Sequence, residues 1–370
     1  MAALCDAMEQ IAPTWAAAEW DNVGLLAGGA KWPLARVLLT IDLTPAVLDE
    51  AIRTKVGAIV SYHPPIFRPI KRMSVDRAAS EGLAAEAVAH RIAVYSPHTA
   101  LDCSPDGTND VIAALAGLED IVPFEIAAKA DRLCKLVVFV PAQQVEKVSD
   151  AVFAAGAGRI GAYERCSYRV NGQGTFFGTE STSPTIGRRG RLERVDEVRL
   201  EVIFPRQRLA DVTAAVRKSH PYEEPAFDVY PLEGLPDGRT GQGRIGRFRK
   251  PIALSMLAKR LAMKTGARCA SRIGRSSERL HRGLVCVGAA GSLPFEIPGE
   301  SLGWGDVVIT GEIRHHDALR YARCGAAAIA LGHSVSERPV LAPLAARLKK
   351  LLPGVSIIVS RADRDPFEAV

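Results

Sequence analysis

Histidines and carboxylates follow apolar runs in this sequence, at the points where those runs stop. His63 follows the run Gly57 to Tyr62 and precedes two prolines, which end a buried strand because proline lacks an N–H donor. His98 and Asp102 follow the next such run, Ile92 to Ser96. Ligands of open α/β sheets bind outside the carboxyl ends of strands. Imidazole nitrogens and carboxylate oxygens placed there suit zinc, iron, manganese or nickel.

A second pair of such residues occurs late in the chain. The apolar run Ala326 to Leu331 leads into Gly332 and His333, and Glu337 lies four residues after His333. If a helix begins near residue 333, both side chains lie on one face, within reach of a single ion. Glu337 taken alone also fits an ordinary first-turn carboxylate, and a single histidine beside a proline is often only hydrogen-bonded to backbone.

Two further histidine clusters favour structural roles. In the segment from His220 to Pro225, Glu223 and Glu224 add carboxylates, but two prolines and a tyrosine in six residues favour a turn. The pair His315 and His316 fits an exposed helix start as well as a site.

Strands and helices alternate through the first 126 residues, which predicts a mainly parallel sheet. Thr44 and Pro45 form an N-cap followed by proline at the first helical position. The predicted elements are strands at 36–41, 57–62 and 92–96 and helices at 46–55 and 76–90.

Residues 127–235 have a different character, and alternation resumes in 236–370. The middle segment predicts the order β-α-β-β-α-β of a small ferredoxin-like module, with 179–194 as a Gly- and Arg-rich loop. In the last segment, strands are predicted at 284–288, 306–310, 326–331 and 355–359, with a helix opening from Gly311. The sequence therefore predicts an α/β fold in which a core of two halves carries an inserted α+β domain.

Composition excludes several classes of protein. The 370 residues are 48% hydrophobic and 24% charged, as in a soluble globular protein, and no run approaches eighteen apolar residues. The net charge of +6 comes from basic residues that are not interleaved with aromatics, so nucleic acid is not an expected partner. Seven cysteines without a C-x-x-C pair predict a reducing, cytoplasmic location.

Five motifs, in order, resemble the Nif-three-like family, also called GTP cyclohydrolase I type 2 homologues. They lie at Trp20 to Leu25, Ser61 to Pro64, His98 to Asp102, Asp306 to Asp317 and Gly332 to Glu337. The middle segment resembles the PII/CutA-like insert of some bacterial members, so the resemblance covers nearly the whole chain. It implies a split core, a PII/CutA-like insert and a ring-shaped homohexamer, a trimer of dimers.

The resemblance also implies a dinuclear metal site. Carried over by position, its ligands fall on His63, Asp102, His333 and Glu337, while the first of the family's paired histidines falls on Tyr62. A neutral phenol with a pKa near ~10 is a poor ligand. We therefore expect one firmly bound divalent ion (Zn, Fe, Mn or Ni) and a second that is weak or absent.

Two functions remain open at this point. The first is metal-dependent hydrolysis of a nucleotide or phosphoester, with His98 and Glu312 as candidates for proton transfer. Because no G-x-x-x-x-G-K-[ST] loop is present, ions and basic side chains would have to hold a phosphate. The alternative is a non-catalytic regulatory or scaffolding ring with a structural metal and an insert that senses a small molecule.

Overall fold

The computed structural model describes residues 1–126, 133–233 and 238–368. The chain divides into two compact units, one of Met1–Ala127 with Pro236–Val370 and one of Ala128–Leu235. The domain boundaries predicted after residues 126 and 235 adjoin residues 127–132 and 234–237, which lie outside the described residues. We describe each unit by itself, starting with the larger.

The first sheet of the larger unit joins strands from both ends of the chain. Its order is β1-β4-β3-β2-β17, and every pair is parallel except β1 with β4, as the alternation predicts. The strands are β1 (Gly24–Ala27), β2 (Arg36–Thr40), β3 (Ala58–Ser61), β4 (Ala93–Ser96) and β17 (Ser356–Val359). Parallel pairing places the ends of β2, β3 and β4 at one edge of the sheet.

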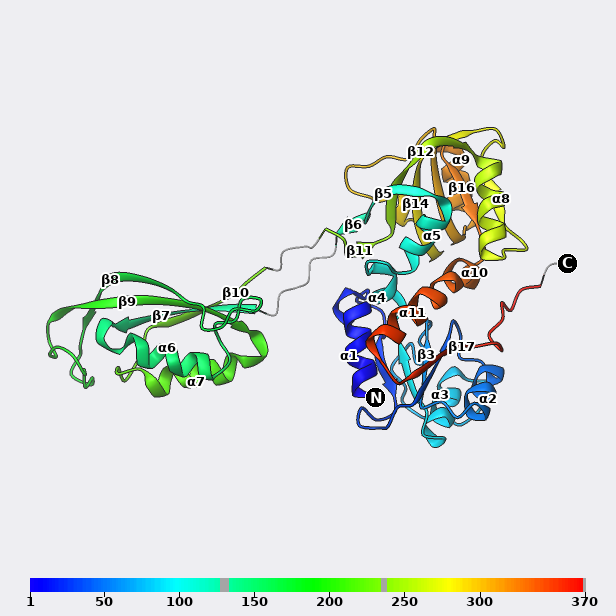
Figure 1. Cartoon of the computed structure of the whole chain (residues 1–370). Helices are drawn as coiled ribbons and strands as arrows, with labels where there is room; N and C mark the ends of the chain where they lie inside the picture. The colour runs from blue at the N-terminus through cyan, green and yellow to red at the C-terminus, as the bar shows by residue number, and fades with distance from the viewer. Residues whose placement is uncertain (127–132, 234–237, 369–370) are drawn as a thin grey trace. The chain divides into compact units, whose positions relative to one another are not determined.

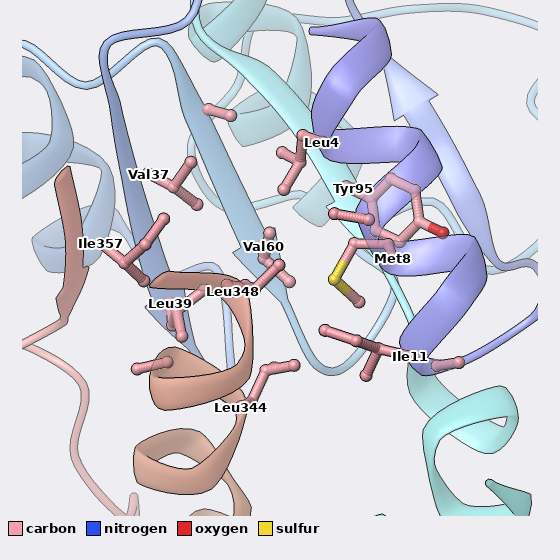
Figure 2. Packing of buried hydrophobic residues seen from close by; sticks show 14 of the residues in the cluster. Leu4, Met8, Ile11, Val37, Leu39, Val60, Tyr95, Leu344, Leu348 and Ile357 are labelled. Carbon is pink, nitrogen blue, oxygen red and sulfur yellow. The ribbon is translucent and has the colours of Figure 1, made fainter. Parts of the chain in front are cut away.

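Helices cover both faces of this sheet (Figure 1). One face packs against α1 (Ala2–Ile11) and α11 (Leu341–Leu351), and Figure 2 shows leucine, isoleucine and methionine side chains filling the space between them. The other face packs against α2 (Pro45–Arg53) and α3 (Ser80–Ala89). With both faces covered, the central strands can be uniformly apolar, which is why they read as continuous hydrophobic runs.

Hydrogen bonds from backbone N–H groups to side-chain oxygens determine where α2 and α3 begin. Thr44 caps α2 by accepting a hydrogen bond from Val47 N at 3.3 Å, as the Thr-Pro signal predicts. The prediction that a helix starts at residue 76 is wrong, because Asp76 Oδ1 accepts from Ala78 N at 3.0 Å and forms a turn before α3.

The second sheet has the order β13-β16-β15-β14-β12-β5 and mixes parallel and antiparallel pairs. Its strands are β5 (Leu118–Val122), β12 (Arg244–Ala253), β13 (Ser271–Ile273), β14 (Arg279–Ala289), β15 (Asp306–Glu312) and β16 (Ala327–Ala330). One face packs against α5 (Thr108–Ala116) and α8 (Leu254–Thr265), and the other against α9 (His315–Cys324). The helix predicted to open from Gly311 begins later, because β15 continues to Glu312.

Two short helices lie where chemistry is expected. The helix α4 (His98–Cys103) follows β4, and α10 (His333–Glu337) follows β16. The start of α10 at residue 333 is the condition under which His333 and Glu337 share a face, so that prediction is confirmed.

The second unit contains β7 (Leu133–Pro141), α6 (Val145–Ala154), β8 (Tyr168–Phe177), β9 (Leu192–Pro205), α7 (Leu209–Ser219) and β10 (Phe227–Pro231). The predicted β-α-β-β-α-β order is confirmed, and the antiparallel sheet runs β10-β7-β9-β8. A core of buried apolar side chains joins the sheet to both helices. The predicted loop 179–194 is shorter than expected, because β9 begins at Leu192.

Candidate metal centre

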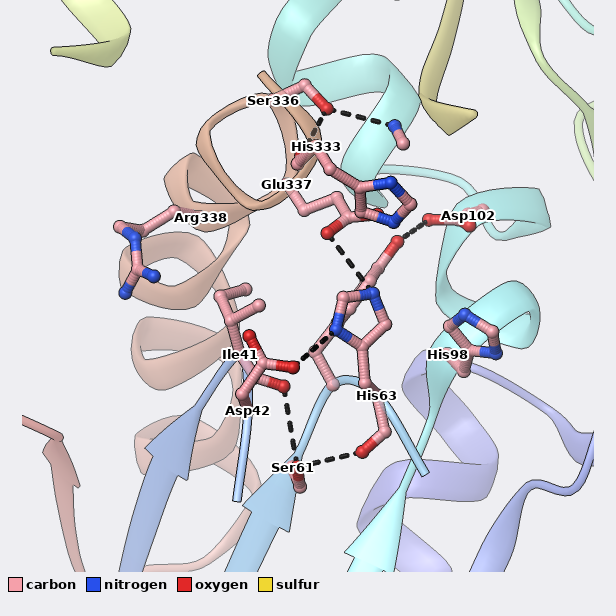
Figure 3. A network of polar contacts seen from close by, with 12 residues as sticks. Ile41, Asp42, Ser61, His63, His98, Asp102, His333, Ser336, Glu337 and Arg338 are labelled. Atoms are coloured by element: carbon pink, nitrogen blue, oxygen red, sulfur yellow. Dashed lines mark hydrogen bonds and ion pairs between the residues drawn. The ribbon is translucent and has the colours of Figure 1, made fainter. Parts of the chain in front are cut away.

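The candidate ligands lie just beyond the ends of strands in the larger unit (Figure 3). His63 follows β3, and α4, which carries His98 and Asp102, follows β4. The helix α10 supplies His333 and Glu337 from the other half of the chain. The larger unit therefore brings ligands from both halves of the sequence to one place.

Two imidazoles face the two oxygens of one carboxylate. Glu337 Oε1 lies 3.3 Å from His333 Nε2, and Oε2 lies 3.3 Å from His63 Nε2. The Glu337 side chain is 4% exposed, and Oε2 makes no properly directed hydrogen bond within the described part of the chain. A buried carboxylate oxygen without such a bond is costly unless a positive charge is placed there.

The Nδ1 atom of each imidazole, on the side away from Glu337, contacts a second carboxylate. Asp42 Oδ1, just after β2, lies 2.9 Å from His63 Nδ1, and Glu312 Oε1 lies 3.2 Å from His333 Nδ1. Both histidines thus direct Nε2 at Glu337. A carboxylate on the outer nitrogen fixes the tautomer that leaves the inner nitrogen free for a metal.

Charge favours the protonated form of His63 when no ion is bound. Burial opposes protonation, but the carboxylates of Asp42 and Glu337 outweigh it and raise the pKa of His63 to about 10. Burial opposes ionisation of Asp42 as well, yet the adjacent His63 holds the pKa of that carboxyl below its ordinary value. The site is therefore arranged to hold positive charge between acidic groups.

The Ser336 side chain and Gly288 position α10 against β14. Ser336 Oγ donates to His333 O at 2.7 Å and accepts from Gly288 N at 2.9 Å. Gly288 has φ +63°, and a Cβ there would lie 2.6 Å from Glu337 Oε1. The site therefore needs a glycine at residue 288, both for its conformation and for its lack of a side chain.

Asp102 has a partner other than an imidazole. The hydroxyl of Tyr62 donates to Asp102 Oδ1, and the Tyr62 side chain is buried. Burial is the main cause that raises the pKa of Asp102, to about 6, and burial likewise raises the pKa of Tyr62. The position to which the resemblance assigns a histidine thus carries a phenol bound to the carboxylate beside the candidate metal centre.

His98 lies next to these groups. Its Nδ1 lies 2.8 Å from Asp21 Oδ1, and Asp21 also accepts from Thr99 N at 3.1 Å. The His98 ring centroid is 5.4 Å from that of His63. His98 has φ +26°, a backbone conformation that a non-glycine residue rarely adopts and that is associated with functional sites.

The residues fit a metal ion. Ligand atoms of His63, His333 and Glu337 all lie within 4.8 Å of one another, and no other group of three His, Cys, Asp or Glu side chains among the described residues does so. Two imidazole nitrogens and a carboxylate suit zinc, iron, manganese or nickel. The unsatisfied Glu337 Oε2 is the atom that such an ion would neutralise.

Not every predicted residue joins this cluster. Glu312 contacts His333, whereas Asp102 and His98 lie beside the cluster and are bound by Tyr62 and Asp21. Sequence reasoning missed Asp42, although the signal that found His63 was present, because Asp42 also follows a predicted strand.

The two histidine clusters outside this site, at His220 and at His315 with His316, have structural surroundings. His220 Nε2 lies 2.9 Å from Phe139 O, and Glu223 Oε1 accepts from Ser183 N at 2.9 Å, as in a structural turn. His315 begins α9 beside His316, and both side chains are exposed. Within the described ranges, none of these residues belongs to a metal-ligand cluster.

The fold and site define an α/β protein with a two-histidine, one-carboxylate candidate metal centre. A family model described as Duf34/NIF3 (NGG1p interacting factor 3) matches residues 1–366, and the chain belongs to this family. The resemblance drawn from the five motifs is therefore confirmed.

Curated relatives are similar over nearly their whole length. A Bacillus subtilis protein called GTP cyclohydrolase 1 type 2 homolog is 35% identical over 364 residues, which is 97% of this chain and 95% of that protein. A protein of the same name from Halalkalibacterium halodurans is 36% identical over 367 residues, covering 97% and 96%.

Solved structures agree with the fold. A Bacillus cereus protein related to NIF3 has a TM-score of 0.69 at 32% identity, covering 99% of this chain and 97% of its own. A Staphylococcus aureus protein has a TM-score of 0.79 at 25% identity, covering 100% and 98%. In the part of this chain that the structure describes, no helix is long and apolar enough to cross a bilayer.

Proposed function

We propose that the protein is a metal-dependent hydrolase that acts on a nucleotide or phosphoester. The observation that carries this proposal is the convergence of His63 and His333 on both oxygens of buried Glu337, one of which makes no properly directed hydrogen bond with any described residue. The name of the curated relatives, GTP cyclohydrolase 1 type 2 homolog, supports hydrolytic chemistry at the family level.

His63, His333 and Glu337 would hold one divalent ion (Zn, Fe, Mn or Ni). Asp102, whose Oδ1 accepts from Tyr62, would serve only a second and weaker ion. When bound, such an ion supplies Lewis acidity and a water of lowered pKa. Asp42 holds the tautomer of His63, and Glu312 does the same for His333.

His98 is our candidate for proton transfer. Asp21 fixes its Nδ1, which leaves Nε2 to take a proton from an attacking water and return it to the leaving group. Glu312 is the second candidate, because its side chain is 53% exposed while touching His333.

The test measures metal content by elemental mass spectrometry, together with hydrolysis of a panel of nucleotides and phosphoesters. We expect about one tightly bound ion per chain and metal-dependent turnover, both lost in Glu337→Gln. Glu81→Gln, at a half-buried position in the first turn of α3 and outside the ligand cluster, is the matched control and should change neither. Full metal binding in Glu337→Gln would contradict the ligand assignment, and a metal-loaded protein inert on the whole panel would contradict the activity.

The alternative is a regulatory or scaffolding ring with a structural metal. The hydrogen bond from Tyr62 to Asp102 favours it, because that bond engages a ligand which a dinuclear mechanism needs. An ion saturated by protein ligands would support this alternative, whereas an ion with exchangeable water would support the hydrolase.

The assembly and the second unit belong to the same proposal. We propose a cytoplasmic homohexamer, a trimer of dimers, in which the unit Ala128–Leu235 acts as a PII/CutA-like insert that binds a small molecule. The observed β-α-β-β-α-β order supports a ferredoxin-like insert. Sedimentation of the full chain checks the assembly, and a monomer at micromolar concentration would contradict it.

A further inference from the structure

Two large aromatic rings lie exposed beside the candidate metal centre. Trp20 is 64% exposed and Phe67 is 44% exposed, and their ring centroids are 5.9 Å apart. Phe67 lies four residues after His63, and Trp20 immediately precedes Asp21, the partner of His98. Two such rings side by side in solvent are unusual for a surface that binds nothing.

These rings continue a series that starts at the metal centre. Ring centroids are 5.4 Å apart between His333 and His63, 5.4 Å between His63 and His98, and 6.1 Å between His98 and Trp20. A ligand whose reacting group lies at His63 and His333 would therefore have Trp20 within reach of its other end.

Hydrogen bonds hold both aromatic segments in place. Asn22 Nδ2 donates to Ile66 O at 2.6 Å, which ties the residues after Trp20 to the residue before Phe67. Asp21 is bound to His98 and Thr99, as described above. The two rings are thus exposed, but hydrogen bonds of the neighbouring residues fix their backbone segments. Ligand binding would therefore cost little conformational entropy in these segments.

The segment that follows Phe67 is basic. Residues 67–78 are all exposed and include Arg68, Lys71 and Arg72. None of these three forms an ion pair with another described residue, so their charge is available to an anion. Apolar stacking surface beside basic side chains is the combination that binds bases joined to phosphates.

We propose that Trp20 and Phe67 hold the planar heteroaromatic ring of the substrate, which makes the substrate a nucleotide rather than a simple phosphoester. The phosphate end lies toward His63 and His333, the ring stacks on Trp20, and the basic side chains that follow Phe67 contribute a positive field that attracts the anionic ligand to the site. This inference rests on the proposed function, since it assigns a substrate class to the same site.

The experiment compares two probes on the full-length, zinc-loaded protein by isothermal titration calorimetry. Guanosine monophosphate carries a base, and ribose 5-phosphate carries the same sugar phosphate without one. We expect guanosine monophosphate to bind more tightly, and Trp20→Ala to weaken its binding roughly tenfold. Trp20→Phe, which keeps a stacking face, should retain most of the affinity, and ribose 5-phosphate should bind all variants equally.

Trp304→Ala is the matched control, because Trp304 is 73% exposed and lies against Gly325, outside the series of rings. It should leave both affinities unchanged. The inference is overturned if guanosine monophosphate fails to bind, if it binds no more tightly than ribose 5-phosphate, or if Trp20→Ala weakens both probes alike. Failure of the hydrolase proposal is distinguishable, because it would appear as binding that depends on Trp20 without turnover.

Discussion

Tyr62 allows a sharp test of how many ions the centre holds. Its hydroxyl donates to Asp102 Oδ1 inside a buried site, at the position to which the family resemblance assigns a histidine. We predict that Tyr62→His raises the bound zinc from about one ion per chain to about two, because the substitution supplies an imidazole and releases Asp102.

The size of the effect follows from that hydrogen bond. A hydrogen bond to a charged group contributes about 1.5–3 kcal/mol to stability. An ion that recruits Asp102 in the natural sequence must displace the phenol, which weakens its binding roughly 10- to 150-fold. A second ion should therefore be removed by mild chelation, whereas the ion at His63, His333 and Glu337 should remain.

The assay is zinc per chain by elemental mass spectrometry after dialysis against a weak chelator, with affinities from competition titration. Tyr62→Phe is the matched control, since it also loses the hydrogen bond but adds no ligand. We expect it to stay at one ion, and both variants to unfold more easily than the natural protein. Two ions retained in the natural protein, or equal zinc content in Tyr62→His and Tyr62→Phe, would refute the reasoning.

Two further predictions concern the surroundings of the centre. Gly288→Ala should weaken zinc binding roughly tenfold or more, because the added Cβ would collide with Glu337 Oε1. Gly291→Ala is the control for backbone strain alone, since Gly291 has φ +55° but nothing within 4 Å of an added Cβ, and it should leave zinc binding unchanged. The buried side chain of Glu50 accepts hydrogen bonds from Ser360 Oγ at 2.5 Å and from Ala362 N at 3.1 Å. Burial opposes ionisation of this carboxyl, but the hydrogen-bond donors outweigh burial and lower the pKa of Glu50. A lowered pKa stabilises the fold above the ordinary value of 4.5, and this stability is lost as pH falls through the folded-state pKa. Glu50→Gln should therefore cost about 1–3 kcal/mol at pH 7 in urea unfolding, and less at pH 4; an equal cost at both pH values would contradict this.

Sequence patterns located most of the site because parallel strands bring their carboxyl ends together. His63 was found from the apolar run and the prolines that end it, and β3 ends at Ser61 as that pattern requires. The four-residue spacing of His333 and Glu337 correctly predicted one helix face, because α10 begins at residue 333. These predictions depend only on local periodicity and strand ends.

Contacts between distant segments could not be read in the same way. Nothing local indicates that the phenol of Tyr62 binds Asp102, because the two residues meet only through the pairing of β3 with β4. Asp42 follows a predicted strand, as His63 does, but no histidine lies near it in the sequence. Only the fold places Asp42 against His63. The strand β12, which lies between β14 and β5, was missed because its polar and charged residues, such as Arg247 and Lys250, interrupt the apolar strand pattern.

The pairing of β17 with β2 has a consequence for how the protein is made. The strand β2 and the residues up to Asp102 leave the ribosome early, whereas Glu337 and β17 follow after about 230 further residues. At ordinary rates of synthesis this interval is roughly 10–50 s. During that time β2 presents an unpaired edge, and the first half holds histidines and carboxylates without Glu337. A metal ion at the candidate centre would therefore bind late in the synthesis of the chain, and a chaperone that covers the β2 edge would protect that edge until β17 pairs with it.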